Sequence, residues 1–201
     1  ESDRLYKLGR EWVRRGDQVT VFTINKGTGL QLGQKKIGLF QSGGLNTVTF
    51  NVDYSSQSGN RKKFFSYLKF ARMVRKQGLQ LPKPDLILAS SPPLSAVWPA
   101  LKLKVHHKVP LVVEIRELWP DAPVQRGSLR GSLLIKRVSR CEQQVYENAD
   151  RIIAGGAGIA EAIKERQTLR AKISIIPEGF EGTELIRLYD KAMAGLVHNK
   201  L

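Results

Sequence analysis

The stretch of this chain with the greatest chemical potential is residues 116–121, with the sequence RELWPD. Arg116 can bind a phosphate or carboxylate through two parallel hydrogen bonds, and Trp119 offers a flat apolar face to a sugar ring. Glu117 can orient a hydroxyl group or accept its proton as a general base. The alternative interpretation is structural: the arginine and glutamate form an ion pair, and Trp119 packs beneath a loop.

A second candidate site is the pair of serines Ser90-Ser91, which follows the apolar run 85–89. Pro92 and Pro93 come next, and proline is favoured in the first turn of a helix. Where a parallel strand meets a helix N-terminus, free N–H groups attract an anion, and the carboxyl ends of the strands form the binding crevice. The two hydroxyls would add donors for a phosphate or a sugar. An ordinary helix cap is the competing interpretation.

Strand and helix patterns alternate along the chain, and the two candidate sites fall between them. Apolar or β-branched runs predict strands at 18–23, 47–52, 85–89, 109–115, 151–154 and 172–176. Helical spacing predicts helices at 3–15, 61–77, 94–107, 132–148, 159–166 and 183–194. Residues 25–44, rich in glycine and polar side chains, predict a long loop. The fold class is therefore α/β: a Rossmann-like parallel sheet with helices on both faces. The strands that feed Ser90 and Arg116 should open onto a shared cleft.

Two other clusters have simpler explanations. The glycines of 155–158 (GGAG) do not fit a dinucleotide-binding loop, because Glu161 stands where the last glycine belongs, and a tight turn is favoured. His106 and His107 lie at a predicted helix end without nearby cysteines or clustered carboxylates, which favours helix capping. We therefore predict no metal site and no cofactor.

The net charge is +15, from 33 Lys and Arg against 18 Asp and Glu. Nucleic acid, an anionic membrane or a phosphorylated substrate would each fit this charge. The predicted helix 61–77 mixes apolar and cationic residues, as a helix lying on an anionic membrane would. A sheet-covering helix with a solvated basic face is equally compatible. The cations that would face the membrane are Lys62, Lys63, Lys69 and Arg72.

The length of the chain and its cysteine content limit the number of domains and disulfide bonds that it can contain. The 201 residues suffice for one α/β domain, and the single cysteine, Cys141, cannot form an internal disulfide. No apolar run approaches the roughly 20 residues of a membrane span, and no signal peptide is evident. The chain begins with a charged helical pattern rather than with Met, so we expect both ends to be truncated.

Several of these segments together resemble the N-terminal lobe of the group 1 retaining GT-B glycosyltransferases. The resemblance is greatest to bacterial enzymes of O-antigen, capsule and colanic acid synthesis. RELWPD, at 116–121, is its most specific element. The other segments that carry the resemblance are VTVFT at 19–23, the basic aromatic helix after Gly59, DLILASSPP at 85–93, Glu142 and Tyr146 before ADRI at 149–152, and IPEG at 176–179.

The resemblance implies the acceptor-side half of a glycosyltransferase that moves a sugar from a nucleotide-sugar donor to a lipid-linked saccharide. The acceptor would be a polyprenyl-diphosphate-linked sugar at the cytoplasmic, inner face of the plasma membrane, which the enzyme meets as a peripheral protein. Arg116 and Glu117 would then be catalytic. Acceptor-binding residues would be Ser90, Ser91, Trp119, Asp121, Arg126 and Arg130.

The chain also departs from the family pattern. The family's first strand is missing, residue 117 is Glu rather than Asp, and Glu178 and Glu181 replace the usual crossover residues. Residues 1–180 would form the acceptor domain and 181–201 a crossover and helix toward an absent donor lobe, so the isolated chain is expected to be inactive. Two other functions stay open: a basic nucleic-acid-binding domain, for which no recognition motif is found, and a fragment of a GT-B-type nucleotide-sugar epimerase.

Overall fold

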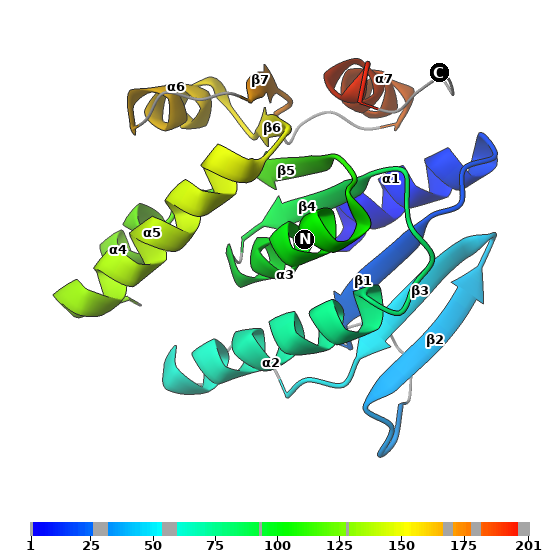
Figure 1. Cartoon of the computed structure of the whole chain (residues 1–201), viewed down its shortest axis with the longest axis horizontal. Coiled ribbons are helices and arrows are strands. Elements are labelled where there is room, and N and C mark those ends of the chain that lie inside the picture. Colours follow the sequence, from blue (N-terminus) through cyan, green and yellow to red (C-terminus); the bar gives the residue numbers. More distant parts are fainter. Residues whose placement is uncertain are drawn as a thin grey trace.

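The computed structural model describes residues 2–25, 32–53, 60–92, 94–127, 129–166, 171–177 and 182–196. The elements within these ranges follow the predicted order, with an additional strand at 37–42 and an additional short helix at 121–125 that the sequence did not predict (Figure 1). The helices are α1 (Ser2–Arg14), α2 (Asn60–Gly78), α3 (Leu94–His107), α4 (Asp121–Gln125), α5 (Ser132–Asn148), α6 (Ala157–Arg166) and α7 (Gly182–Met193). The strands are β1 (Thr20–Ile24), β2 (Ile37–Ser42), β3 (Leu45–Phe50), β4 (Ile87–Ser91), β5 (Leu111–Ile115), β6 (Arg151–Ala154) and β7 (Lys172–Ile175).

The strands form two sheets rather than one. The larger has the order β4-β5-β6-β7 and is parallel throughout, whereas the smaller has the order β1-β3-β2. In the smaller sheet β1 pairs in parallel with β3, and β2 pairs antiparallel with β3. The edge strands β1 and β4 do not pair with each other, and no strand within the described ranges pairs with both of them and joins the two sheets. The predicted α/β class with a helix-covered parallel sheet is confirmed.

The predicted loop over 25–44 is wrong for its second half, where β2 and β3 form a tight hairpin. Gly43 and Gly44 make the two-residue turn, with φ of 56° and 82°. Positive φ at both central positions matches the twist of antiparallel strands, and glycine adopts it without steric cost. The Gly-Gly pair was thus a hairpin signal in the sequence. The first part of the predicted loop, 26–31, lies outside the described residues.

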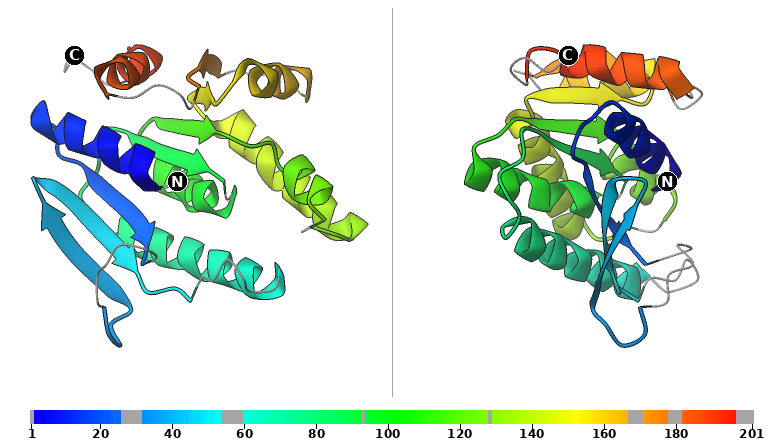
Figure 2. Two further views of the ribbon diagram at one scale, coloured as in Figure 1. Left: turned by 180° about the vertical axis from the view of Figure 1, so that it is seen from behind. Right: turned by 90° about the vertical axis from the view of Figure 1, so that its right-hand side faces the viewer.

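The faces of the larger sheet are covered by different helices, as Figure 2 shows from two further sides. Side chains alternate across a strand, and β5 divides its residues accordingly. Leu111, Val113 and Ile115 pack in a core with α3 and α5, whereas Val112 packs in a second core with α1 and α7. Position 114 therefore faces the α1–α7 layer. There the sequence places a glutamate among apolar neighbours.

The smaller sheet has its own core beneath α2. Val48, Phe50 and Val52 pack against Phe70 and Val74 of this helix. The helix ends close to α3, because a Cβ at Gly78 would lie 2.6 Å from a methyl of Leu103. Thus α2 covers a sheet with its apolar stripe, whereas its described cations Lys62, Lys69, Arg72, Arg75 and Lys76 are exposed. None of the helices in the described ranges is long and apolar enough to cross a bilayer.

Candidate functional site

The two predicted rims lie side by side at the carboxyl ends of β4 and β5. Ser90 pairs in register with Glu114 and Ser91 with Ile115, and the backbone N–H of Arg116 donates to the Ser91 carbonyl at 3.0 Å. The next strand joins them through Gly155, whose N–H donates to the Ile115 carbonyl at 2.9 Å. The rims of three parallel strands thus meet, which is where ligands bind in open α/β sheets.

The glycine turn after β6 has a packing role at this rim. A Cβ on Gly155 would lie 3.3 Å from the Arg116 Cα and 3.5 Å from the Ile115 carbonyl oxygen. A side chain there would push directly against the backbone that carries Arg116. The favoured interpretation of 155–158, a tight strand-to-helix turn, matches this geometry, since α6 begins at Ala157.

Two buried donors at the rim lack a hydrogen-bond partner within the described part of the chain. These are the hydroxyl of Ser91 and the indole N–H of Trp119. An unpaired buried polar group costs about 1–3 kcal/mol, so such groups are rare in folded proteins and call for an explanation. Ser91 ends β4 and Trp119 lies three residues after Arg116, so both donors belong to segments at the binding rim, as donors kept for a ligand would.

The charged residues of the predicted site occupy defined positions. Glu117 is half-buried and forms an ion pair with Arg126. Arg116 itself is half-buried. Arg130 is exposed and donates from Nε to the Gly127 carbonyl at 3.2 Å. Two cations therefore lie in the loop that follows the rim, one of them already neutralised by a carboxylate.

The loop 117–121 is held from below by a cluster of four side chains, the Glu142 clasp, defined as Glu142, Tyr146, Arg166 and Asp121. Glu142 Oε1 accepts hydrogen bonds from the backbone N–H of Trp119 at 2.9 Å and from the Tyr146 hydroxyl at 2.7 Å. Its other oxygen pairs with Arg166 at 3.0 Å, and Arg166 also contacts Asp121. Asp121, predicted to bind acceptor, thus fixes the loop through Arg166.

The clasp perturbs the ionisation of its buried members. Burial raises the pKa of the Glu142 carboxyl, against the opposing effects of Tyr146, Arg166 and the Trp119 N–H. Burial raises the pKa of Tyr146 well above its usual range, and the neighbouring Glu142 adds to the shift. The Tyr146 hydroxyl therefore stays protonated and donates at any ordinary pH.

A second buried cluster, the Glu114 cluster, consists of Glu114, Arg4, Tyr189 and Ser90. Glu114 is only 1% exposed. It accepts hydrogen bonds from Ser90 Oγ at 2.7 Å and from the Tyr189 hydroxyl at 2.5 Å, and it pairs with Arg4 Nε at 3.2 Å. Arg4 also donates to the carbonyls of Ile176 and Pro177. Ser90, predicted to bind acceptor, therefore donates its hydroxyl hydrogen to a buried carboxylate.

Sequence reasoning missed the Glu114 cluster and the function of the clasp. Glu142 and Tyr146 had a signal, because residues four apart share one helix face. Glu114 also had one, since a lone acid inside a buried apolar strand requires a partner. Their cationic partners Arg4 and Arg166 are distant in sequence, so nothing local identified them.

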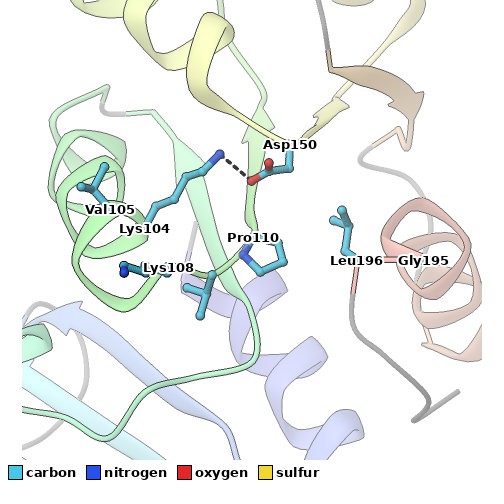
Figure 3. A pocket seen from close by; sticks show the side chains of 8 residues that line it. Lys104, Val105, Lys108, Pro110, Asp150, Gly195 and Leu196 are labelled. Carbon is cyan, nitrogen blue, oxygen red and sulfur yellow. Dashed lines mark ion pairs between the residues drawn. The ribbon is translucent and has the colours of Figure 1, made fainter.

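A shallow cavity of about 410 Å³ lies at the amino-terminal ends of the strands, before the start of β5 (Figure 3). Lys104 forms an ion pair with Asp150 at 2.7 Å on one side of it. The lining residues are Lys104, Val105, Lys108, Val109, Pro110, Asp150, Gly195 and Leu196. Residues 104–110 precede β5 and Asp150 precedes β6, whereas Ser91 and Arg116 lie at the carboxyl ends of β4 and β5. The cavity is therefore separate from the predicted site.

The predicted membrane-facing cations lie on α2. Lys62 is exposed and pairs with Asp53 at 2.7 Å, and Lys69 and Arg72 are also exposed. The side chain of Lys63 lies outside the described part of the structure. Among the residues that the structure describes, no group of three or more His, Cys, Asp or Glu side chains could hold a metal ion.

Comparison with known proteins gives a family and a fold. Residues 2–179 match the family described as "Glycosyl transferase 4-like domain". The structure of sucrose-phosphate synthase from Thermosynechococcus elongatus superposes with a TM-score of 0.56 at 17% identity, over 93% of this chain and 88% of that chain. At this identity the likeness shows the fold alone.

Two curated relatives match a shorter segment. The guanine nucleotide-binding protein alpha-1 subunits of Oryza sativa subsp. indica and subsp. japonica are each 30% identical over 86 residues. This segment is 40% of the chain, which spans only 22% of the length of those relatives. The family model covers most of the chain and agrees with the observed fold. The chain therefore belongs to the glycosyl transferase 4-like family and is a glycosyltransferase domain with the Rossmann-like lobe of the GT-B fold.

Proposed function

We propose that this domain binds the acceptor for a glycosyltransferase of cell-surface polysaccharide synthesis. The acceptor is a polyprenyl-diphosphate-linked sugar at the inner face of the plasma membrane. The nucleotide-sugar donor is held mainly by a second lobe. The observation that carries the proposal is the rim of β4 and β5, where Arg116 bonds to Ser91 and the segments that end the two strands carry the unpaired donors of Ser91 and Trp119.

The proposed roles follow from the chemistry of the side chains. Arg116 and Arg126 bind the acceptor diphosphate, because a guanidinium matches two phosphate oxygens at once. Glu117, which pairs with Arg126, is released to orient the attacking hydroxyl when the diphosphate takes over this arginine. In a retaining transfer the leaving phosphate can accept the proton, so Glu117 need not be a strong base. Arg130 and Asp121 are placed along the same loop.

The proposal predicts that the two unpaired donors contribute to acceptor affinity. Ser91→Ala and Trp119→Phe each remove one donor, and each should weaken binding of a short-chain, water-soluble polyprenyl-diphosphate sugar about 3- to 10-fold. Ser91→Ala should leave the free energy of unfolding unchanged or higher, because the hydroxyl has no partner to lose. Isothermal calorimetry and urea unfolding measure the two effects.

Thr49 provides the matched control. Its hydroxyl is also buried without a partner, but it lies on β3 in the smaller sheet. Thr49→Val should leave acceptor affinity unchanged. The proposal is contradicted if Ser91→Ala and Trp119→Phe bind the acceptor as tightly as the unaltered chain, or if Thr49→Val weakens binding equally.

A separate prediction concerns the donor. Because the donor pocket is assigned to another lobe, this chain should bind nucleotide sugars only weakly. Calorimetry with a panel of uridine, guanosine and thymidine diphosphate sugars should give no saturable heat at concentrations that saturate the acceptor site. Tight, stoichiometric binding of any of them would show that the domain holds the donor instead.

A further inference from the structure

Helix α5 is longer than the core it covers. From Val138 to Ala149 its apolar side chains pack against α3 and the larger sheet. The same stripe, continued backward at helical spacing, passes through Leu134 in the first turn. Figure 1 shows this first part of the helix extending beyond the ends of the strands, at the lower left. We call residues 132–137 the α5 overhang.

The overhang exposes large apolar side chains. Leu133 is 75% exposed and Leu134 36% exposed. Val124, on the preceding helix α4, is 38% exposed. One exposed leucine is common on a protein surface, but two consecutive ones at a projecting helix end form a compact apolar tip.

The tip is surrounded by positive charge. The chain has no Asp or Glu between residues 122 and 141. Within this stretch only Arg126 forms an ion pair to a carboxylate among the described residues. The cations are Arg126, Arg130, Lys136, Arg137 and Arg140, and all five are exposed. Apolar side chains ringed by Lys and Arg are typical of segments that enter the interface of an anionic bilayer.

The overhang lies at the same end of the molecule as the candidate site. In Figure 1 the arrowheads of β4 and β5 point toward the end where α4 and the first turn of α5 lie. Only the short helix α4 and the loops on either side of it separate Arg116 at the rim from Ser132 at the start of the overhang. Helix α2 also begins at this end, with the exposed Phe65 and the cation Lys62 near its start.

We infer that the α5 overhang is the membrane-inserting element of this domain, with Leu133 and Leu134 entering an anionic bilayer and Lys136 and Arg137 contacting the headgroups. The inference rests on the proposed function for its choice of membrane, and it deepens that function by assigning the contact to a particular helix end. Insertion there brings the rim of β4 and β5 close to the plane in which a lipid-linked diphosphate lies.

Charge argues against a second copy of the chain as the occupant. In a two-fold dimer the same patch meets itself, so the cations around one tip would face those around the other. Like charges brought together in this way are repulsive, whereas phosphatidylglycerol headgroups neutralise them. A bilayer therefore satisfies both features of the overhang, its apolar tip and its basic surround.

The test is sedimentation of the chain with vesicles of phosphatidylcholine, with and without phosphatidylglycerol. The chain should bind the anionic vesicles and not the neutral ones. Leu133→Asp with Leu134→Asp should weaken binding at least about tenfold. Lys136→Glu with Arg137→Glu should weaken it about tenfold or more at low salt and less at high salt.

Two matched controls distinguish insertion of the overhang from non-specific binding of exposed apolar side chains to vesicles. Leu39→Asp on β2 and Val105→Asp on α3 change side chains that are 71% and 74% exposed, away from the overhang. Both should bind vesicles as the unaltered chain does. Equal loss in these controls, or full binding by the Leu133/Leu134 variant, overturns the assignment. Self-association that this variant abolishes, seen by analytical ultracentrifugation without lipid, identifies a second copy as the occupant and overturns it too.

The outcome is separable from that of the proposed function. The Leu133/Leu134 variant should still bind the water-soluble acceptor analogue with unchanged affinity, because neither leucine belongs to the rim. If the unaltered chain binds the analogue but not the vesicles, the overhang assignment alone fails. If it binds vesicles but not the analogue, the proposed acceptor function fails and the overhang assignment stands.

Discussion

Replacing Glu114 with glutamine is expected to lower the free energy of unfolding by about 3 kcal/mol. Glutamine keeps the shape of the side chain, and its Oε1 can still accept from Tyr189. The amide NH2 that replaces Oε2 cannot accept from Ser90, and the negative charge is removed. Arg4, whose side chain is only 11% exposed, then keeps its charge without a carboxylate. Urea unfolding followed by circular dichroism at neutral pH measures the loss.

An exposed ion pair supplies the control. Glu184 pairs with Arg187 at 3.0 Å on the surface of α7, with side chains that are 44% and 76% exposed. Glu184→Gln should leave the unfolding midpoint unchanged, since solvent screens such pairs. If Glu114→Gln is as harmless as this control, the Glu114 cluster contributes little and the burial argument is wrong.

The Glu114 cluster is expected to act as a unit. It links four elements: Arg4 lies on α1, Ser90 on β4, Glu114 on β5 and Tyr189 on α7. Burial raises the pKa of Tyr189, and the adjacent Glu114 adds to the shift, so its hydroxyl remains a donor. Arg4 extends the link to the carbonyls of Ile176 and Pro177, which follow β7. The orientation of Ser90 at the rim thus depends on the packing of both terminal helices.

The sequence predicted the elements of this fold well because each carries its own local pattern. Apolar runs at 85–89 and 109–115 identified the interior strands, and glycines and prolines marked their ends. Adjacent strands joined by a helix were then expected to be neighbours, and the bond from Arg116 to Ser91 confirms this. The exceptions were the short helix α4, which was not predicted, and β2, where the Gly43-Gly44 turn was the informative feature and the polar composition was misleading.

The contacts of the site could not be predicted in the same way. Glu117 pairs with Arg126, which lies nine positions further along the chain. Arg166 reaches Asp121 from α6 across 45 positions in the sequence. Such pairs depend on how helices pack on the sheet, which a single sequence does not specify. The proposed roles of the site residues therefore remain predictions.

Replacing Arg166 with methionine is expected to destabilise the domain by about 2–3 kcal/mol at neutral pH. Methionine retains the apolar length of the side chain but removes the only cation that pairs with Glu142 among the described residues. Glu142 is 4% exposed and would then carry an uncompensated charge. Asp121 would lose its partner as well, so the loop 117–121 should become more mobile and acceptor affinity should fall.

The pH dependence of stability distinguishes this explanation from a simple packing defect. Burial raises the pKa of Glu142 in the folded chain above its ordinary value of 4.5, which the unfolded chain keeps. At a pH between the unfolded and the folded pKa, the folded chain therefore holds a proton that the unfolded chain has released. The Glu142 contribution is then largest in acid and is lost as the pH rises through the folded pKa. Arg166→Met raises that pKa further, because a stabilising cation is removed, so its loss of stability should extend to higher pH. Glu142→Gln has no carboxyl to titrate and should lack this decline. Urea unfolding of all three proteins from acid to neutral pH tests the prediction, and parallel curves for Arg166→Met and the unaltered chain would contradict it.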